Sequence, residues 1–222
     1  MSFDWPPTGN QAVILLAAFL LAWYAVGLHL NRRRGAQLVR QVRDAVRVLG
    51  GSATIRWMGR SAFRIDAEQL SGSVSRLGLS VLLEPRETFL LWLVGRLAGR
   101  RDWLMLSAVL SGPAGPAFEA YHPKRRGAPD AARRIALEGW KAERVPGRSL
   151  LIAGRDADAR ALGQEVLQAL AGIEVWGASL HPEEQRLTLS LPVPAAETRT
   201  GLPAIAVLPQ LADLILRRSR KF

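Results

Sequence analysis

The sequence predicts an α+β fold, with one N-terminal transmembrane helix followed by a cytosolic domain in which helices pack on a mainly antiparallel sheet. Three observations lead to this prediction. Residues 12–28 carry no charge, residues 31–34 read Asn-Arg-Arg-Arg, and beyond residue 51 short alternating apolar runs exchange with runs of helical period. We therefore expect a short extracytoplasmic tail (1–10), a transmembrane helix (11–30), a basic juxtamembrane helix (31–50) and a cytosolic α+β domain (51–222).

The apolar segment has the length of a single membrane span. Residues 12–30 number about 19, or roughly 28 Å of helix, close to the hydrocarbon thickness of a bilayer. A cleaved signal peptide begins with basic residues, whereas Asp4 is the only charged residue among the first thirty. The alternative is a buried core helix of a soluble domain.

The flanking charges predict the orientation and the membrane-interface residues. Arginines beside a span stay in the cytosol, so the N-terminus is expected outside. After the span, Leu38, Val42, Val46 and Leu49 follow a helical period, and an arginine stripe on another side is expected over lipid headgroups. The expected interface residues are Trp5, Trp23, Tyr24, Arg32, Arg33, Arg34, Arg40, Arg43 and Arg47.

The first part of the domain reads as strands interrupted by one helix. Runs 54–58 and 62–66 alternate around a Gly-Arg turn and predict a hairpin. Residues 71–83 predict a third strand, in which Gly72 and Gly78 indicate a bulge or a close neighbouring backbone. Pro85 is expected to open a helix with an apolar face, because a missing N–H costs nothing in the first turn. The run 103–110 then restores the strand period.

The second part is expected to hold further strands and two helices. Strands are predicted at 118–122, 135–140 and 149–153, and the last leads into a helix capped by Asp156. Runs 173–180 and 186–191 predict a second hairpin. The closing helix has its apolar residues at Ala206, Leu208, Leu211, Leu214 and Ile215.

The sequence offers little chemistry. It has no cysteine, and His29, His122 and His181 lie far apart without ligand spacing, so neither a metal nor a cofactor is expected. The Gly154 turn lies where phosphate loops occur but lacks the second glycine and the lysine. We therefore expect a protein that is not an enzyme and takes no small-molecule substrate.

The charge predicts polyanionic partners. The net charge is +11, and Asp4 is the only charge before residue 31, so the remainder carries +12. Anionic lipid headgroups and RNA are both suitable partners, and an excess that merely solvates the surface is the third interpretation. The candidate polyanion contacts are Arg96, Arg100, Arg101, Lys124, Arg125, Arg126, Arg133, Arg134, Arg217, Arg218, Arg220 and Lys221.

Several blocks of the chain resemble the calumin family, the coiled-coil-domain-containing subunit of the PAT complex. The matching blocks are the apolar segment with its Asn-Arg-Arg-Arg end, Ser80–Arg86 running into Leu90–Leu97, Trp103–Leu110, Ser149–Leu170, Leu187–Pro194 and Leu208–Phe222. The resemblance is distant, because few of these blocks are identities. The long acidic lumenal region and the basic coiled coil of that family have no counterpart here.

The resemblance implies a single-pass accessory factor or chaperone for membrane-protein insertion. Its partners would be the membrane, the Sec translocon, the ribosome and a small membrane protein, and its mechanism would be binding and shielding. The alternative is a membrane-anchored scaffold or anionic-lipid-binding domain without a translocon role.

Overall fold

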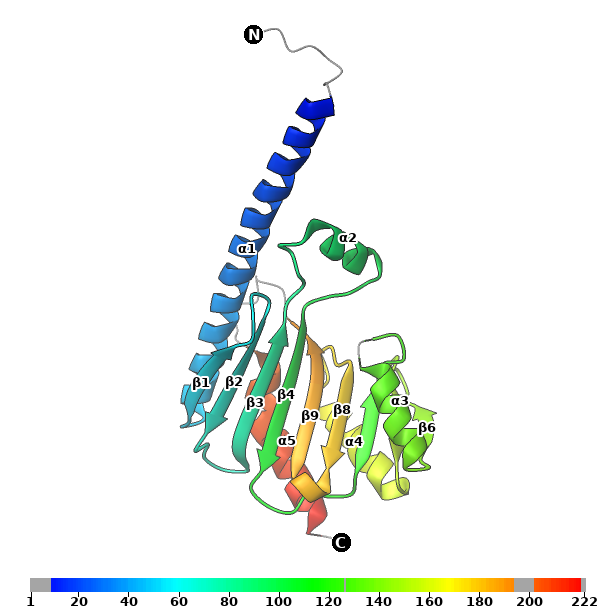
Figure 1. The fold of residues 1–222 in the computed structure, drawn as a ribbon. Coiled ribbons are helices and arrows are strands. Elements are labelled where there is room, and N and C mark those ends of the chain that lie inside the picture. Colours follow the sequence, from blue (N-terminus) through cyan, green and yellow to red (C-terminus); the bar gives the residue numbers. More distant parts are fainter. Residues whose placement is uncertain (1–8, 126, 194–201, 221–222) are drawn as a thin grey trace.

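The computed structural model describes residues 9–125, 127–193 and 202–220, and it opens with one long helix. Helix α1 (Gly9–Val48) is 40 residues long, so the two helices expected at 11–30 and 31–50 are a single helix. It ends where predicted, at the glycine pair, and Gly50 has a φ of 77°. Its first half rises above the sheet and its second half packs against it (Figure 1). The expected interface residue Trp5 lies outside the described residues.

The described strands form one sheet in which all neighbours are antiparallel. Their order is β1-β2-β3-β4-β9-β8-β5-β7-β6. The α+β class predicted from the sequence is therefore confirmed.

The first four strands follow one another in the sheet. They are β1 (Ser52–Trp57), β2 (Ala62–Glu68), β3 (Val74–Leu82) and β4 (Trp103–Leu110). The predicted hairpin is β1–β2, and the predicted irregularity is a register shift in β3 between Val74 and Arg76. Alternating burial along β4 directs Leu104, Leu106 and Leu110 to the core, as a half-covered strand requires.

The remaining strands complete the other half of the sheet. They are β5 (Phe118–Tyr121), β6 (Lys141–Arg144), β7 (Leu151–Gly154), β8 (Gly177–His181) and β9 (Arg186–Pro192). The predicted second hairpin is β8–β9, joined by a short 3₁₀ turn, Pro182–Glu184. Strands β7 and β8 flank β5 and are joined through α4 (Ala157–Ala169), the arrangement of a split β-α-β unit.

Three helices cover one face of the sheet and form the core with it. The second half of α1 lies over β1 and β2, α5 (Pro203–Ser219) lies over β3, and α4 lies over β5, β7 and β8 (Figure 1). The predicted stripe of α1 is confirmed at Leu38, Val42 and Val46, which are at most 2% exposed. The predicted capping of α4 is also confirmed, since the Ala159 N–H donates to Asp156 Oδ1 at 2.8 Å.

The strand expected at 135–140 is wrong. Helix α3 (Ala128–Leu137) occupies most of this region and lies on the other face of the sheet against β5, and the next strand, β6, begins only at Lys141. Proline in the first turn and the helix-forming residues Ala131, Ala132 and Ala136 favour a helix here. The expected strand 118–122 exists as β5.

The helix expected from Pro85 begins four residues later. Helix α2 (Phe89–Leu97) follows the N-cap Thr88, and residues 83–88 form a loop. Its apolar residues do not pack on the sheet. They are exposed: Leu90 by 67%, Leu91 by 61%, Val94 by 64% and Leu97 by 80%.

Candidate functional site at the junction of α1 and α2

Helix α1 is long and apolar enough to cross a membrane, by length and composition. Only 6% of its most apolar 18-residue window is buried within the protein. A core helix of a soluble domain would be largely covered by its neighbours, so this exposure argues against the alternative of a buried core helix. The apolar surface of this window is therefore largely uncovered by the described part of the chain.

Helix α2 lies beside the upper half of α1, above the sheet (Figure 1). The ring of Phe89 packs edge-on against Phe19 and Trp23, with centroids 5.4 and 4.9 Å apart, and Trp92 lies 5.2 Å from Trp23. Such tilted aromatic pairs contribute about 0.5–1.5 kcal/mol each beyond the area they bury. The aromatic cluster thus fixes α2 against the apolar segment of α1.

A glycine allows the loop before α2 to approach α1. A Cβ on Gly27 would lie 2.2 Å from the carbonyl oxygen of Arg86. The same carbonyl accepts a hydrogen bond of 2.8 Å from the Trp23 indole N–H, one helical turn earlier. Trp23 and Gly27 of α1 thus form the contact surface for the 83–88 loop.

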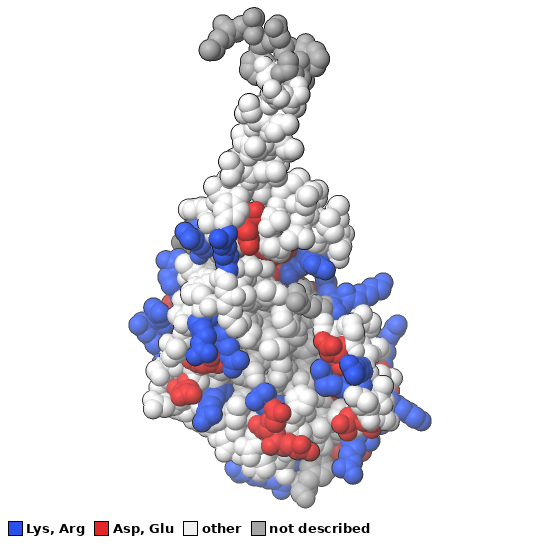
Figure 2. All heavy atoms as spheres, viewed as in Figure 1, with Lys and Arg blue, Asp and Glu red and all other residues white. Residues whose placement is uncertain are grey.

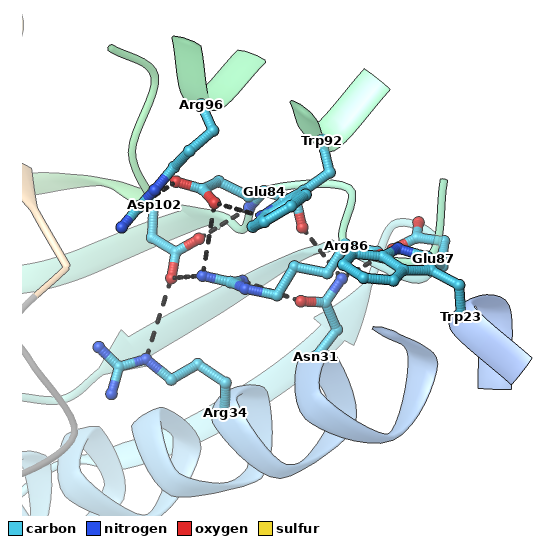
Figure 3. A network of polar contacts seen from close by, with 9 residues as sticks. All are labelled: Trp23, Asn31, Arg34, Glu84, Arg86, Glu87, Trp92, Arg96 and Asp102. Carbon is cyan, nitrogen blue, oxygen red and sulfur yellow. Dashed lines mark hydrogen bonds and ion pairs between the residues drawn. The ribbon is translucent and has the colours of Figure 1, made fainter. Parts of the chain in front are cut away.

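A set of nine residues, which we name the junction network, joins α1, the loop, α2 and β4 (Figure 3). Asn31, fully buried on α1, occupies its centre. Its amide donates to the Glu84 carbonyl at 3.0 Å and to Glu87 Oε2 at 2.8 Å, and its Oδ1 accepts from Arg86 at 2.9 Å. The junction network comprises Trp23, Asn31, Arg34, Glu84, Arg86, Glu87, Trp92, Arg96 and Asp102.

Asp102, 8% exposed at the start of β4, collects the next set of contacts. It accepts the Glu84 backbone N–H at 2.7 Å and an Arg86 N–H at 2.9 Å, and Arg34 Nε lies 3.9 Å from Oδ2. Burial lowers the pKa of Arg34 from its ordinary value, Asp102 opposes this by raising it, and neighbouring Arg86 lowers it further. Asp102 thus ties α1 to the sheet through charge.

Glu84, 7% exposed, connects the network to α2. Its carboxylate accepts the Trp92 indole N–H at 3.1 Å and lies 3.4 Å from Arg96 Nη1. With Glu87 and Asp102 it balances the three arginines of the network. Every buried side-chain nitrogen or oxygen in the described chain has a hydrogen-bond partner, as a stable buried polar cluster requires.

The junction network consists of contacts that position α1, the loop, α2 and the start of β4 relative to one another. It brings together carboxylates, guanidiniums, an amide and indoles, and no nucleophile paired with a base. Within residues 9–125, 127–193 and 202–220, no group of His, Cys, Asp and Glu could hold a metal ion. The arrangement holds the short apolar helix α2 at a fixed position along the long helix α1.

The structure distributes the expected interface residues over four environments. Trp23 and Arg34 belong to the junction network, and Tyr24 accepts a hydrogen bond from Arg60, whose guanidinium lies 5.4 Å from its ring. Arg32 and Arg33 are exposed at the end of the apolar segment. The unbroken course of α1 puts the remaining three, Arg40, Arg43 and Arg47, roughly 15–25 Å along the helix axis from Leu30.

The expected polyanion contacts do not gather on one face. Those of the α2 end, of α3 with its preceding loop, and of the end of α5 lie at the top, the flank and the bottom of the domain in Figure 1. Figure 2 shows Lys and Arg interspersed with Asp and Glu over the face in view, while the upper part of α1 is uncharged. Arg126 and Lys221 lie outside the described residues.

Several of these arginines have intramolecular partners. Arg96 pairs with Glu84, Arg134 with buried Glu119 at 2.6 Å, and Arg218 with Glu165. Arg125 lies 3.7 Å from Glu174 and stacks over Trp176 at 4.9 Å. Exposed side chains are found at Arg100, Arg101, Lys124, Arg133, Arg217 and Arg220.

Sequence reasoning missed the centre of the site. Gly27, Asn31, Glu84 and Asp102 received no role, although a polar amide closing an apolar run and a Glu-Pro-Arg step after a strand were visible signals. The partners of Asn31 lie 53–56 residues away along the chain, so only the fold brings them together. No protein-family model and no curated protein matches this chain.

Proposed function

We propose that this chain is a single-pass membrane protein that acts as a non-enzymatic accessory factor for the insertion of other membrane proteins. The observation that carries the proposal is the position of α2, which exposes four large apolar side chains beside the apolar half of α1. The two helices together offer an apolar surface to a hydrophobic segment of another chain.

The height of α2 on α1 supports a membrane location for both helices. Trp23, which contacts Phe89 and Trp92, precedes Leu30 by seven residues, or about 10 Å of helix. If the apolar segment spans the bilayer, α2 lies in the leaflet next to the domain. Transfer of its exposed leucines and valine from water to lipid is favourable by up to about 1.5–3 kcal/mol for each fully buried side chain.

The 83–88 loop has the polar satisfaction that a lipid environment demands. Irregular backbone is tolerated at membrane depth only where protein groups satisfy it. Here the Glu84 and Arg86 carbonyls accept from Asn31 and Trp23, and the Glu84 N–H donates to Asp102. This loop is thus equipped to cross the headgroup level.

The orientation follows from the positive charges. Arg32, Arg33 and Arg34 follow the apolar segment directly, and such arginines remain cytosolic. The N-terminus is therefore outside and the sheet domain is in the cytosol. This is the arrangement of the calumin family that the sequence resembles, and the proposed partners are accordingly the Sec translocon, the ribosome and a small membrane protein.

The proposal is tested by photo-crosslinking in the native membrane. A photoreactive amino acid is introduced in place of Leu91 on α2 or, as a control, in place of Val48, which is 87% exposed at the far end of α1. We expect the Leu91 probe to capture nascent membrane proteins or translocon subunits during their synthesis, and the Val48 probe to capture neither. Capture of lipid alone at Leu91 would contradict the accessory role.

A second candidate is a membrane-anchored scaffold that binds anionic lipid. It is favoured by Arg32 and Arg33, which are exposed at the end of the apolar segment and have no described side-chain partner. In that case the full-length protein, captured from its own membranes, would carry neither translocon subunits nor ribosomes. Ribosome binding at physiological salt would instead favour the first candidate.

A further inference from the structure

A cavity of about 230 Å³ lies between α2, the end of β3 and the loop that leads into β4. Its apolar wall is formed by Leu82, Leu91 and Trp92, and its polar wall includes Ser61, Arg100 and Arg101. Pockets for drug-sized ligands measure roughly 300–1,000 Å³. This cavity is smaller and suits a single headgroup rather than a whole organic ligand.

The two arginines at the cavity have no ion-pair partner among the described residues. In the described part of the chain neither Arg100 nor Arg101 forms an ion pair or a side-chain hydrogen bond, whereas nearby Arg96 pairs with Glu84. The stem of Arg100 lies across the last turn of α2, because a Cβ on Gly95 would lie 3.4 Å from its Cδ. The Arg100 N–H also donates to the Gly95 carbonyl at 2.9 Å.

Among the described residues that line the cavity, Glu84 is the one carboxylate, and its charge is already balanced by arginines. Glu84 accepts from Trp92 and lies within ion-pair distance of Arg96 and Arg86. The local excess of charge is therefore that of Arg100 and Arg101. Guanidinium groups without partners beside a small cavity are the usual donors to phosphate oxygens.

We infer that this cavity binds the phosphate of an anionic glycerophospholipid from the cytosolic leaflet, with an acyl chain running along Leu91 of α2. The inference rests on the proposed membrane position of α1 and α2. A phosphate in this cavity lies just below α2, at headgroup level, and the apolar wall continues upward into the exposed face of α2. Ribosomal RNA offers the same phosphate chemistry but has no acyl chain to contact the apolar wall.

The test measures lipid retained by the full-length protein. Wild type, the double variant Arg100→Gln/Arg101→Gln and the control Lys124→Gln/Arg133→Gln are released into mild detergent and examined by native mass spectrometry, with phosphatidylglycerol or phosphatidylcholine added. The control removes the same charge from exposed side chains near α3. We expect wild type and control to retain one phosphatidylglycerol in preference to phosphatidylcholine, and the double variant to lose at least tenfold in occupancy.

Three results would overturn the inference. They are equal retention of both lipids by wild type, equal retention of phosphatidylglycerol by the double variant, and RNA rather than lipid bound in a manner that depends on the two arginines. Thermal unfolding of each variant shows that the loss is not a folding defect. Alkaline extraction of the same membranes separates the two proposals. A protein that is extracted would refute the membrane span itself. A protein that resists extraction but shows no lipid preference would refute only lipid binding in the cavity.

Discussion

The carbonyl oxygen of Arg86 lies 2.2 Å from the point that a Cβ on Gly27 would occupy, so the loop before α2 rests directly on the backbone of α1. No rotamer change relieves such a contact, since the carbonyl belongs to the backbone and the position of a Cβ is fixed by the backbone. The height of α2 on α1 is thus set by a residue without a side chain.

Gly27→Ala should displace the loop. We expect a destabilisation of about 1–3 kcal/mol, the usual cost of overpacking, and separation of Phe89 from Trp23. Thermal unfolding in detergent, together with tryptophan fluorescence, measures both. Gly9→Ala is the matched control, because nothing lies within 4 Å of a Cβ at Gly9. Identical melting of the two variants would mean that the loop does not rest on α1.

Asp102→Asn should destabilise the junction network. The change removes the charge that faces Arg86 and Arg34 in a buried site, and breaking a buried pair costs about 3–5 kcal/mol. Asp66→Asn is the control, since Asp66 forms an exposed pair with Arg64 whose contribution is about 0–1 kcal/mol. The comparison is made by chemical unfolding in detergent. A loss in Asp102→Asn no larger than in the control would mean that the network is solvated.

Val94→Cys should be protected from reagents in the membrane. The chain has no cysteine, so a single introduced thiol reports on its own site. Val94 is 64% exposed within the protein, and Val48→Cys, at a valine 87% exposed at the C-terminal end of α1, is the control. We expect a membrane-impermeant maleimide to label the Val48 variant rapidly and the Val94 variant only after detergent is added. Rapid labelling of both would place α2 in water.

Arg134→Met should destabilise the contact between α3 and β5. Arg134 pairs with Glu119, which is 5% exposed, and the neighbouring Arg133 is exposed without a described partner. We expect a loss of about 1–2 kcal/mol, discounted because the Arg134 side chain is about half exposed, and almost none for Arg133→Met. Equal losses in equilibrium unfolding would refute the role of this pair.

The pH dependence of the same pair has a defined sign. The hydrogen bond to Glu119 raises the pKa of Arg134, so its contribution to stability is complete below the ordinary arginine pKa and is lost only as the pH rises through the higher folded value. The charge of Arg134 is therefore present throughout the physiological range. Wild-type unfolding curves between pH 6 and 9 should show no step from this arginine.

The sequence predicted elements whose signals are local. The stripe of Leu38, Val42 and Val46, the two hairpins and the cap at Asp156 each depend on neighbours a few residues away, and all were found in the structure. Helix α3 was not predicted, because the apolar residues Ile135 and Trp140 suggested a strand. The alanines that follow Pro129 favour the helix that is found.

The candidate site could not be predicted from the sequence, for a different reason. An asparagine at the end of an apolar run has no local feature that identifies Glu84, Arg86 and Glu87 as its partners. Likewise, the apolar residues of α2 are exposed because the junction network holds that helix away from the sheet. Periodicity predicts which residues share a side of a helix, but not whether that side is buried. Membrane location, partners and lipid binding remain predictions for the experiments above.

The unbroken course of α1 also limits how the domain can move relative to this helix. The helix enters the core at Leu38, Val42 and Val46 without a linker, and the junction network braces it above the sheet. In a bilayer the domain therefore cannot swing on a flexible stalk. Under the proposed membrane span, α1 and the domain would diffuse and rotate together as one rigid body, and a partner would meet the domain at a fixed distance from the membrane surface.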